Sequence, residues 1–182
     1  CEQPRVPEQN PTCFYQRTIT LSNDWLANEQ GRVVFDGVDS AFYLWCNESW
    51  VGYSQDSRLP AEFGLTAYLR PGENSLKLVV FRYCDGSYLE DQDMWNLSGI
   101  FRSVSLLRKP QARITDFRVT ASLDDRYVDG VLDVQVVTED AQDCQIVVSL
   151  YDANDLSRPV MTTTPQNLGT RQIDEKGAYA NR

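Results

Sequence analysis

Short segments in which hydrophobic and polar positions alternate follow one another along the first 109 residues. In the first segment, Tyr15, Ile19 and Leu21 fall on one side of a two-residue period, and polar residues fall on the other. Further segments of this kind, or short β-branched and aromatic runs, cover residues 32–35, 41–46, 50–53, 76–81 and 99–107. Because successive side chains of a strand point to opposite faces, each segment is predicted to be a β-strand.

Turn-forming residues separate these segments, as at Asp36-Gly37 and in the run Pro71-Gly72-Glu73-Asn74. We expect residues 41–53 to form a hairpin of two aromatic-rich strands around 47–49, and residues 56–64 to hold one helical turn. No segment shows a convincing helical period of 3.6 residues. Regularly spaced strands without helices predict an all-β fold, here a jelly-roll β-sandwich.

A polar stretch with a proline, residues 108–113, follows the last of these strands and suggests a domain boundary. Beyond it, residues 114–119, 131–136 and 144–150 alternate again. We therefore predict a jelly-roll domain over 1–109 and a partial immunoglobulin-like β-sandwich over 110–182. The second domain is expected to be truncated, because a complete sandwich of this kind needs about seven strands in about 100 residues.

Composition and charge narrow the classes of function. The chain carries 26 acidic against 17 basic residues, a formal charge of −9, which disfavours nucleic acid and anionic membrane surfaces as partners. No apolar run approaches the roughly 20 residues of a membrane span. The chain has no histidine, so a Ser-His-Asp triad, a Cys-His pair and a His-ligated metal site are all excluded within it.

The cysteines are five in number and widely spaced, with no C-x-x-C pair. An odd, dispersed set fits neither a dense disulfide framework nor a chelating zinc site. We expect all five to be reduced and unpaired, and the protein to be cytoplasmic; they are Cys1, Cys13, Cys46, Cys84 and Cys144.

The densest acidic cluster is Glu90-Asp91-Gln92-Asp93, flanked by Tyr88 and Trp95. Two carboxylates suggest glycosidase chemistry, which needs a pair about 5–10 Å apart. In an extended strand Asp91 and Asp93 would lie about 6.5 Å apart on one face. A solvated loop without a role is an equal alternative, and a loop that binds a cation and a sugar is a third, because hard cations prefer oxygen ligands.

A second cluster consists of the aromatic residues Phe42, Tyr43, Trp45, Trp50 and Tyr53. These side chains could form a platform that stacks on carbohydrate, but alternating aromatics more often fill a sandwich core, which we expect here. In the polar stretch that follows, Asp56 and Arg58 are expected to make local hydrogen bonds or an ion pair.

Two ordered blocks resemble the sugar-binding domain of the β-galactosidases of glycoside hydrolase family 2. The first block contains FDGVDSAF, LWCN, WVGY and QDSRLPAEF between residues 35 and 63; the second contains DGSYLEDQDMW and SGIFR between 85 and 102. The resemblance is close over 31–109 and looser to the end of the chain. The sequence departs from the familiar pattern at Asp39 and Cys84, where we expect effects on local packing alone.

The resemblance implies a non-catalytic front region of a retaining β-galactosidase, whose two catalytic glutamates belong to a barrel domain outside this chain. By the same resemblance Asp93 contacts galactose hydroxyls and helps hold sodium, and Gln55 and Asp85 are magnesium ligands. The remaining ligands of both ions would lie outside the chain. The implied partners are a β-galactoside and further copies of the protein, as a tetramer. A free-standing carbohydrate-binding or adhesion module is the alternative.

Overall fold

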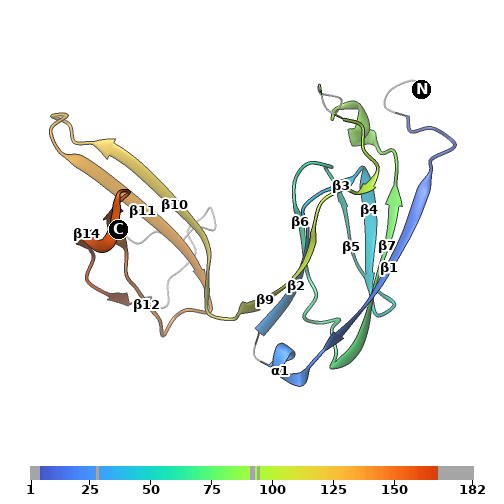
Figure 1. Ribbon diagram of the computed structural model, residues 1–182, viewed down its shortest axis with the longest axis horizontal. Helices are drawn as coiled ribbons and strands as arrows, with labels where there is room; N and C mark the ends of the chain where they lie inside the picture. Colours follow the sequence, from blue (N-terminus) through green and yellow to red (C-terminus); the bar gives the residue numbers. More distant parts are fainter. Residues whose placement is uncertain (1–4, 28, 91–92, 94, 168–182) are drawn as a thin grey trace. The chain divides into compact units, whose positions relative to one another are not determined.

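The chain folds into two compact units, Cys1–Pro110 and Gln111–Arg182, and the division falls one residue beyond the predicted boundary. The computed structural model describes residues 5–27, 29–90, 93 and 95–167 (Figure 1). All the sheets in these residues are built from antiparallel strand pairs, which confirms the all-β prediction. No helix in the described part of the chain is long and apolar enough to cross a membrane.

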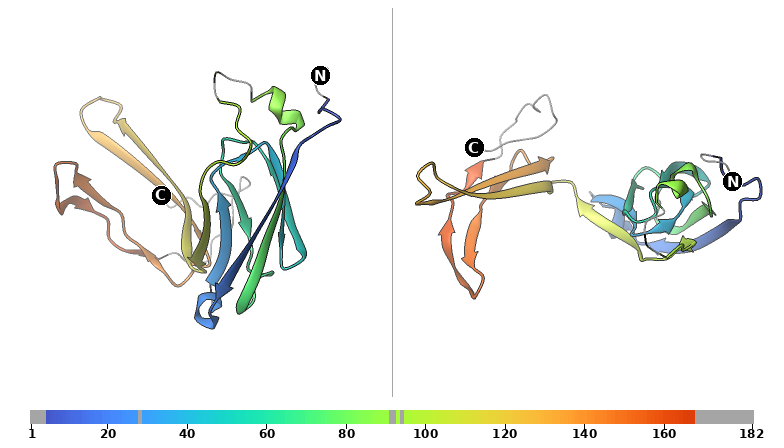
Figure 2. Two further views of the ribbon diagram at one scale, coloured as in Figure 1. Left: turned by 45° about the vertical axis from the view of Figure 1, so that its right-hand side comes forward. Right: turned by 90° about the horizontal axis from the view of Figure 1, so that it is seen from above.

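The described residues of the first unit form three sheets (Figures 1 and 2). The four-stranded sheet has the order β1 (Thr12–Leu21), β7 (Gly72–Phe81), β4 (Ala41–Cys46) and β5 (Ser49–Gln55). The three-stranded sheet has the order β6 (Ala61–Gly64), β2 (Glu29–Phe35) and β9 (Val104–Pro110), and the two-stranded sheet pairs β3 (Val38–Asp39) with β8 (Gly99–Ile100). The predicted hairpin of aromatic strands is β4–β5 and is confirmed.

The core of the first unit lies between the inner faces of the two larger sheets. Phe42 and Leu44 from β4 meet Val33 and Phe35 from β2, and all four side chains are almost completely buried. The Phe35 and Phe42 rings are 4.9 Å apart between centroids. Burial of each such side chain contributes about 1.5–3 kcal/mol, so this interior supplies most of the stability of the unit. Tyr15, Ile19 and Leu21 lie on the inner side of β1, as their period predicts.

Two asparagines hold the turns at one end of the sandwich. Asn74, which is 1% exposed, donates to the carbonyls of Arg70 (2.7 Å) and Gly72 (3.0 Å). Its Oδ1 accepts from the Arg70 N–H (2.9 Å) and from Nδ2 of Asn47 (2.7 Å). Asn47 Oδ1 in turn accepts from the Ser75 N–H (2.9 Å). Every donor and acceptor of Asn74 is therefore used, which is what a buried amide requires.

One local prediction was wrong. Residues 56–64 contain a turn at 57–58 and then strand β6, not a helical turn. Phe63 packs against the core and β6 pairs with β2 from Arg32↔Gly64 to Phe35↔Ala61, so tertiary pairing decides this segment. A single helical turn, α1 (Asn23–Leu26), forms elsewhere, where Ser22 Oγ accepts from the Trp25 N–H (3.3 Å).

The second unit is described as three antiparallel pairs. They are the long hairpin β10 (Arg113–Leu123) with β11 (Gly130–Glu139), then β12 (Gln145–Ile146) with β15 (Gln166–Asn167), and β13 (Ser149–Asp152) with β14 (Asp155–Thr162). Val136 and Ala141 are the buried hydrophobic residues in its described part. The described part of the second unit thus has much less interior than that of the first.

Candidate substrate-binding loop

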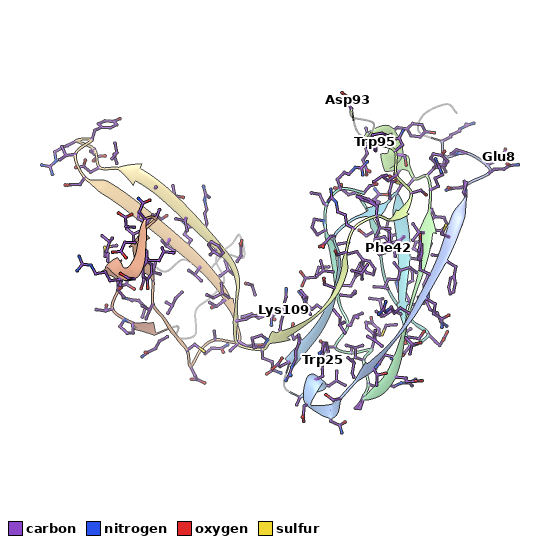
Figure 3. All side chains as sticks on the ribbon, viewed as in Figure 1. Glu8, Trp25, Phe42, Asp93, Trp95 and Lys109 are labelled. Carbon is purple, nitrogen blue, oxygen red and sulfur yellow. The ribbon has the colours of Figure 1, made fainter. Side chains whose placement is uncertain are left out.

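The acidic cluster lies in residues 84–98, which we call the site loop and which connect β7 to β8. Its first turn is a 3-10 helix, Asp85–Tyr88. Asp93 and Trp95 lie at the far end of the first unit from Trp25 (Figure 3). Both side chains are exposed, Trp95 by 86%. Asp91 and Gln92 are outside the described residues, so the predicted Asp91–Asp93 separation stays a prediction.

The beginning of the site loop is held in place by the buried residue Ser40, which is 1% exposed. Its hydroxyl donates to Cys84 Sγ (2.9 Å) and hydrogen-bonds with Ser87 Oγ (3.0 Å), while Ser87 Oγ accepts from the Cys84 N–H (3.0 Å). Just before the loop, the Asn10 side chain donates to the Tyr83 carbonyl (2.8 Å) and accepts from its N–H (3.0 Å). These side chains reach the loop from segments distant in sequence, so the fold determines its starting direction.

The later part of the site loop is held by the residues after β5. The Ser57 N–H donates to Glu90 Oε2 (3.2 Å), and Arg58 Nη2 donates to the Trp95 carbonyl (2.6 Å). The expectation of a local interaction between Asp56 and Arg58 is therefore wrong for this guanidinium group, which hydrogen-bonds 37 residues away. Asp93 lies between the two anchored positions, Glu90 and Trp95.

Phe101 and Arg102 support Arg58. The Arg58 and Arg102 guanidinium carbons lie 5.1 and 5.2 Å from the centroid of the Phe101 ring, within cation–π distance. Arg102 Nη1 donates to the carbonyls of Arg58 (2.8 Å) and Asp36 (3.2 Å). A Cβ added at Gly37 would lie 2.8 Å from Phe101, so this packing requires glycine there. The FDG and SGIFR motifs thus act together as a platform for the loop.

A cavity of about 360 Å³ lies beside the site loop. Its wall includes the charged residues Asp39, Arg58, Arg82 and Glu90, together with Cys84. Burial raises the pKa of Asp39 above its ordinary value; the Arg58 guanidinium opposes this shift and the Glu90 carboxylate adds to it. Donors and acceptors in one concave site suit a neutral ligand with many hydroxyls. Asp39 and Cys84, expected to matter for packing alone, both line this cavity.

The two residues implied as magnesium ligands lie near Tyr53. Gln55 Oε1 accepts from the Tyr53 hydroxyl (2.7 Å), and Asp85, at the start of the 3-10 helix, accepts from the Gly86 N–H (2.9 Å). Burial raises the pKa of Tyr53, and Cys84 and Asp85 nearby raise it further. Oxygen donors from Gln55 and Asp85 are of the type that Mg²⁺ prefers. Within the described residues, no three His, Cys, Asp or Glu side chains are placed to hold a metal ion.

The aromatic cluster is divided between the two faces of its sheet. Phe42 is in the core, as expected. Tyr43, Trp45, Trp50 and Tyr53 lie on the opposite face, and Trp50 and Tyr53 are 49% and 45% exposed. The core prediction is therefore wrong for these four. The reason is that β4 is apolar at successive positions, so one strand presents aromatics to both sides.

Ser40, Ser57 and Asn10 were not recognised from the sequence, although they hold the site loop. Each is a common polar residue outside the strands, and its partner is 33 to 73 residues away. Periodicity and spacing carry no signal for contacts of this range. The positions of Ser40 and Ser57 within the first resembling block are the available hints.

The jelly-roll unit with its anchored site loop has the form of a sugar-binding domain. The model of the sugar binding domain of glycosyl hydrolases family 2 matches residues 1–110, and the chain belongs to this family. A β-galactosidase of Aeromonas hydrophila is 53% identical over 182 residues, and one of Klebsiella pneumoniae is 50% identical over 179. These alignments cover 100% and 98% of this chain but 17% of each relative, so the chain spans about a sixth of their length.

Solved structures show the same fold at low sequence identity. A β-glucuronidase of an uncultured Clostridium species superposes with a TM-score of 0.69 at 23% identity, over 92% of this chain and 31% of that one. A β-D-glucuronidase of Dictyoglomus thermophilum gives 0.67 at 16% identity, over 86% and 29%. Both similarities concern the fold.

Proposed function

We propose that this chain is the substrate-binding front region of a β-galactosidase, and that its site loop presents Asp93 to a terminal galactose. The observation that carries the proposal is the anchoring of the loop on both sides of Asp93, through Ser57–Glu90 and Arg58–Trp95. A carboxylate held in this way can accept hydrogen bonds from sugar hydroxyls in a fixed geometry. The identity of about 50% to β-galactosidases along the whole chain supports galactose as the sugar.

Asp93 is assigned a positioning role in this proposal and no role at the glycosidic bond. Retaining hydrolysis needs one carboxyl as acid and base and a second as nucleophile, about 5–5.5 Å apart. We place both of these groups in polypeptide outside residues 1–182, since the chain spans about a sixth of its relatives. An exposed carboxylate at a loop tip then serves best as a fixed anion that orients the substrate.

The same reasoning extends to the cations. We propose Asp93 as a ligand of sodium, and Gln55 and Asp85 as ligands of magnesium, with the remaining ligands outside this chain. The Gln55 and Asp85 oxygens flank Tyr53 and fit a hard cation. Bound there, the magnesium ion would neutralise Asp85 and fix the start of the site loop. Assembly of the intact protein as a homo-oligomer and a cytoplasmic location are further parts of the proposal.

The test is the substitution Asp93→Asn in the full-length protein, which keeps the shape of the side chain and removes its charge. We expect kcat/KM for a nitrophenyl β-galactoside to fall by about 10²-fold or more, as for a lost positioning contact, and the dependence on sodium to weaken. A covalent glycosyl-enzyme should still form with a slow substrate. Asp125→Asn, at an exposed carboxylate in the second unit, is the control and should change neither quantity.

Two results would contradict the assignment. Unchanged kcat/KM and sodium dependence would show that Asp93 touches neither substrate nor cation. Rescue of Asp93→Asn by azide, with formation of a galactosyl azide, would show instead that Asp93 acts directly at the anomeric carbon.

A further inference from the structure

The cavity of about 360 Å³ beside the site loop is formed by segments that are distant in sequence. Asp39 belongs to β3, Arg58 follows β5, and Arg82 follows β7, while Glu90 is part of the site loop. Asp93 is not among the described residues of the wall. The fold therefore creates a concave site that adjoins the loop but does not contain the carboxylate proposed to contact galactose.

Four charged side chains line this cavity, two acidic and two basic: Asp39, Glu90, Arg58 and Arg82. Among the described residues, none of the four forms a salt bridge with another. A guanidinium group has five N–H donors. Within the same residues, Arg58 uses one in a hydrogen bond to the Trp95 carbonyl (2.6 Å), and Arg82 uses one for the Tyr83 hydroxyl (3.1 Å). Most of this hydrogen-bonding capacity is therefore available to a ligand.

The carboxylates of the wall also keep acceptor capacity. Asp39 accepts from the Ser57 hydroxyl through Oδ1 (3.4 Å), and Glu90 accepts from the Ser57 N–H through Oε2 (3.2 Å). An ionised carboxyl group has about four acceptor positions on its two oxygens. A ligand in the cavity thus meets both donors and acceptors, and each of these groups is already oriented by a bond to the protein.

The two signs of charge are interspersed along the wall. Burial raises the pKa of Asp39, the Arg58 and Arg82 guanidinium groups oppose this shift, and the Glu90 carboxylate adds to it, so charges of both signs act on Asp39. The two acidic and two basic groups cancel, which gives an anion or a cation no net attraction. A zwitterion would need the signs separated at two ends. A hydroxyl group both donates and accepts, so a neutral molecule with several hydroxyls can bridge carboxylate and guanidinium groups.

The remaining wall and the volume indicate the size of such a molecule. Tyr83 and Tyr88 supply aromatic surface, which suits the C–H face of a sugar ring. The Tyr88 hydroxyl donates to the Arg5 carbonyl, and this bond holds the ring beside the cavity. Ligand pockets measure roughly 300–1,000 Å³, so a volume of about 360 Å³ is at the small end. One sugar ring fits this description better than a chain of several.

We propose that this cavity is a saccharide site in its own right, which binds one neutral hexose between Arg58, Arg82, Asp39 and Glu90. The inference does not depend on the contact between Asp93 and galactose. It gives the cavity a consequence for the loop, because Arg58 and Glu90 also hold the positions on either side of Asp93. A hexose in the cavity adds contacts to the same side chains that fix the site loop.

The test is a saturation-transfer NMR titration of the full-length protein with methyl α-D-galactopyranoside, a neutral hexose whose α linkage is not that of a β-galactoside. The catalytic position is first occupied as a covalent glycosyl-enzyme formed from a 2-deoxy-2-fluoro galactoside. We expect the methyl hexoside still to bind, with a dissociation constant of about 1 mM, as for a ligand of this small size.

Substitutions in the wall locate the bound hexose. Arg82→Ala and Asp39→Asn should each weaken its binding by about tenfold, as expected for a lost hydrogen bond to a charged group. Arg17→Ala, at an exposed arginine of β1, is the matched control and should leave binding unchanged. Arg82 is itself exposed, so Arg82→Ala should keep the urea midpoint of the unmodified protein, which separates loss of the site from loss of the fold.

Four results would overturn the proposal. They are no binding to the blocked protein, binding that survives both wall substitutions, tighter binding of sulfate or glycine than of the hexoside, and equal loss of binding in Asp93→Asn. The last result would assign the hexose to the position at Asp93 instead of the cavity. Unchanged kcat/KM in Asp93→Asn contradicts the proposed function alone and leaves this titration as it is, so the two failures are distinguishable.

Discussion

The substitution Asn74→Asp tests whether the buried amide network holds the first unit together. It changes one NH₂ group into an oxygen and leaves the volume of the side chain unaltered. Nδ2 of Asn74 now donates to the carbonyls of Arg70 and Gly72, at 2.7 and 3.0 Å. After the change an oxygen would face both carbonyl oxygens, in a position that is 1% exposed.

The magnitude follows from these contacts. Two carbonyls lose their donor, at about 1–3 kcal/mol for each buried group left without a partner. The introduced carboxylate is also buried, which adds to the cost. The bonds that Oδ1 accepts, from Arg70 and Asn47, can persist. We therefore expect the free energy of unfolding to fall by about 3–5 kcal/mol at neutral pH, and by less in acid, where the protonated carboxyl recovers one donor.

Urea unfolding followed by tryptophan fluorescence measures this loss for the first unit alone. All four tryptophans belong to that unit; they are Trp25, Trp45, Trp50 and Trp95. With a slope of about 1–3 kcal/mol per molar urea, the midpoint should fall by roughly 2 M. Asn23→Asp, on an exposed residue in the first turn of α1, makes the same chemical change and should shift stability by less than about 0.5 kcal/mol.

The reasoning would be refuted by equal midpoints for Asn74→Asp and the unmodified chain. That result would mean that the turn residues find other partners, or water, at no cost. A loss of the same size for Asn23→Asp would point to a general effect of added negative charge on a chain that already carries −9.

Two further predictions concern charge and thiols. Glu62 accepts hydrogen bonds from Lys109 (2.7 Å) and Arg32 (2.9 Å), and the Lys109 bond is the main reason that its pKa is lowered. Because the pKa of Glu62 is lower in the folded than in the unfolded chain, its ionised carboxylate stabilises the fold at pH values above the unfolded pKa, and this contribution is lost as the pH falls through the folded pKa. In urea titrations, Glu62→Gln should therefore lower the free energy of unfolding by about 0.5–1 kcal/mol at pH 7 and by almost nothing near pH 3. The four described cysteines are free, so a disulfide-forming reagent should modify the exposed Cys13 and Cys144 at once and the two buried thiols after unfolding; a bridge found without reductant would contradict this.

The sequence by itself determined the strands and the class of fold. The two-residue period of β1 and the turn residues around 37, 48 and 72 are local signals, and local sterics and hydrogen bonding decide such elements. The acidic cluster around Asp93 falls in the connection between β7 and β8, and its role in substrate binding stays a prediction. The buried face of β1, with Tyr15, Ile19 and Leu21, could be predicted from the sequence because burial follows the two-residue period of the strand.

The tertiary structure alone decided which residues meet. Residues 61–64 became a strand because β2 offered an edge with which to pair, and Arg58 reached Trp95 because the sandwich brings their loops together. The two-residue period predicts that Tyr43 and Phe42 point to opposite faces of the sheet, but it does not predict which face is buried in the core. Burial depends on what lies across a surface, and the sequence of one strand does not specify that.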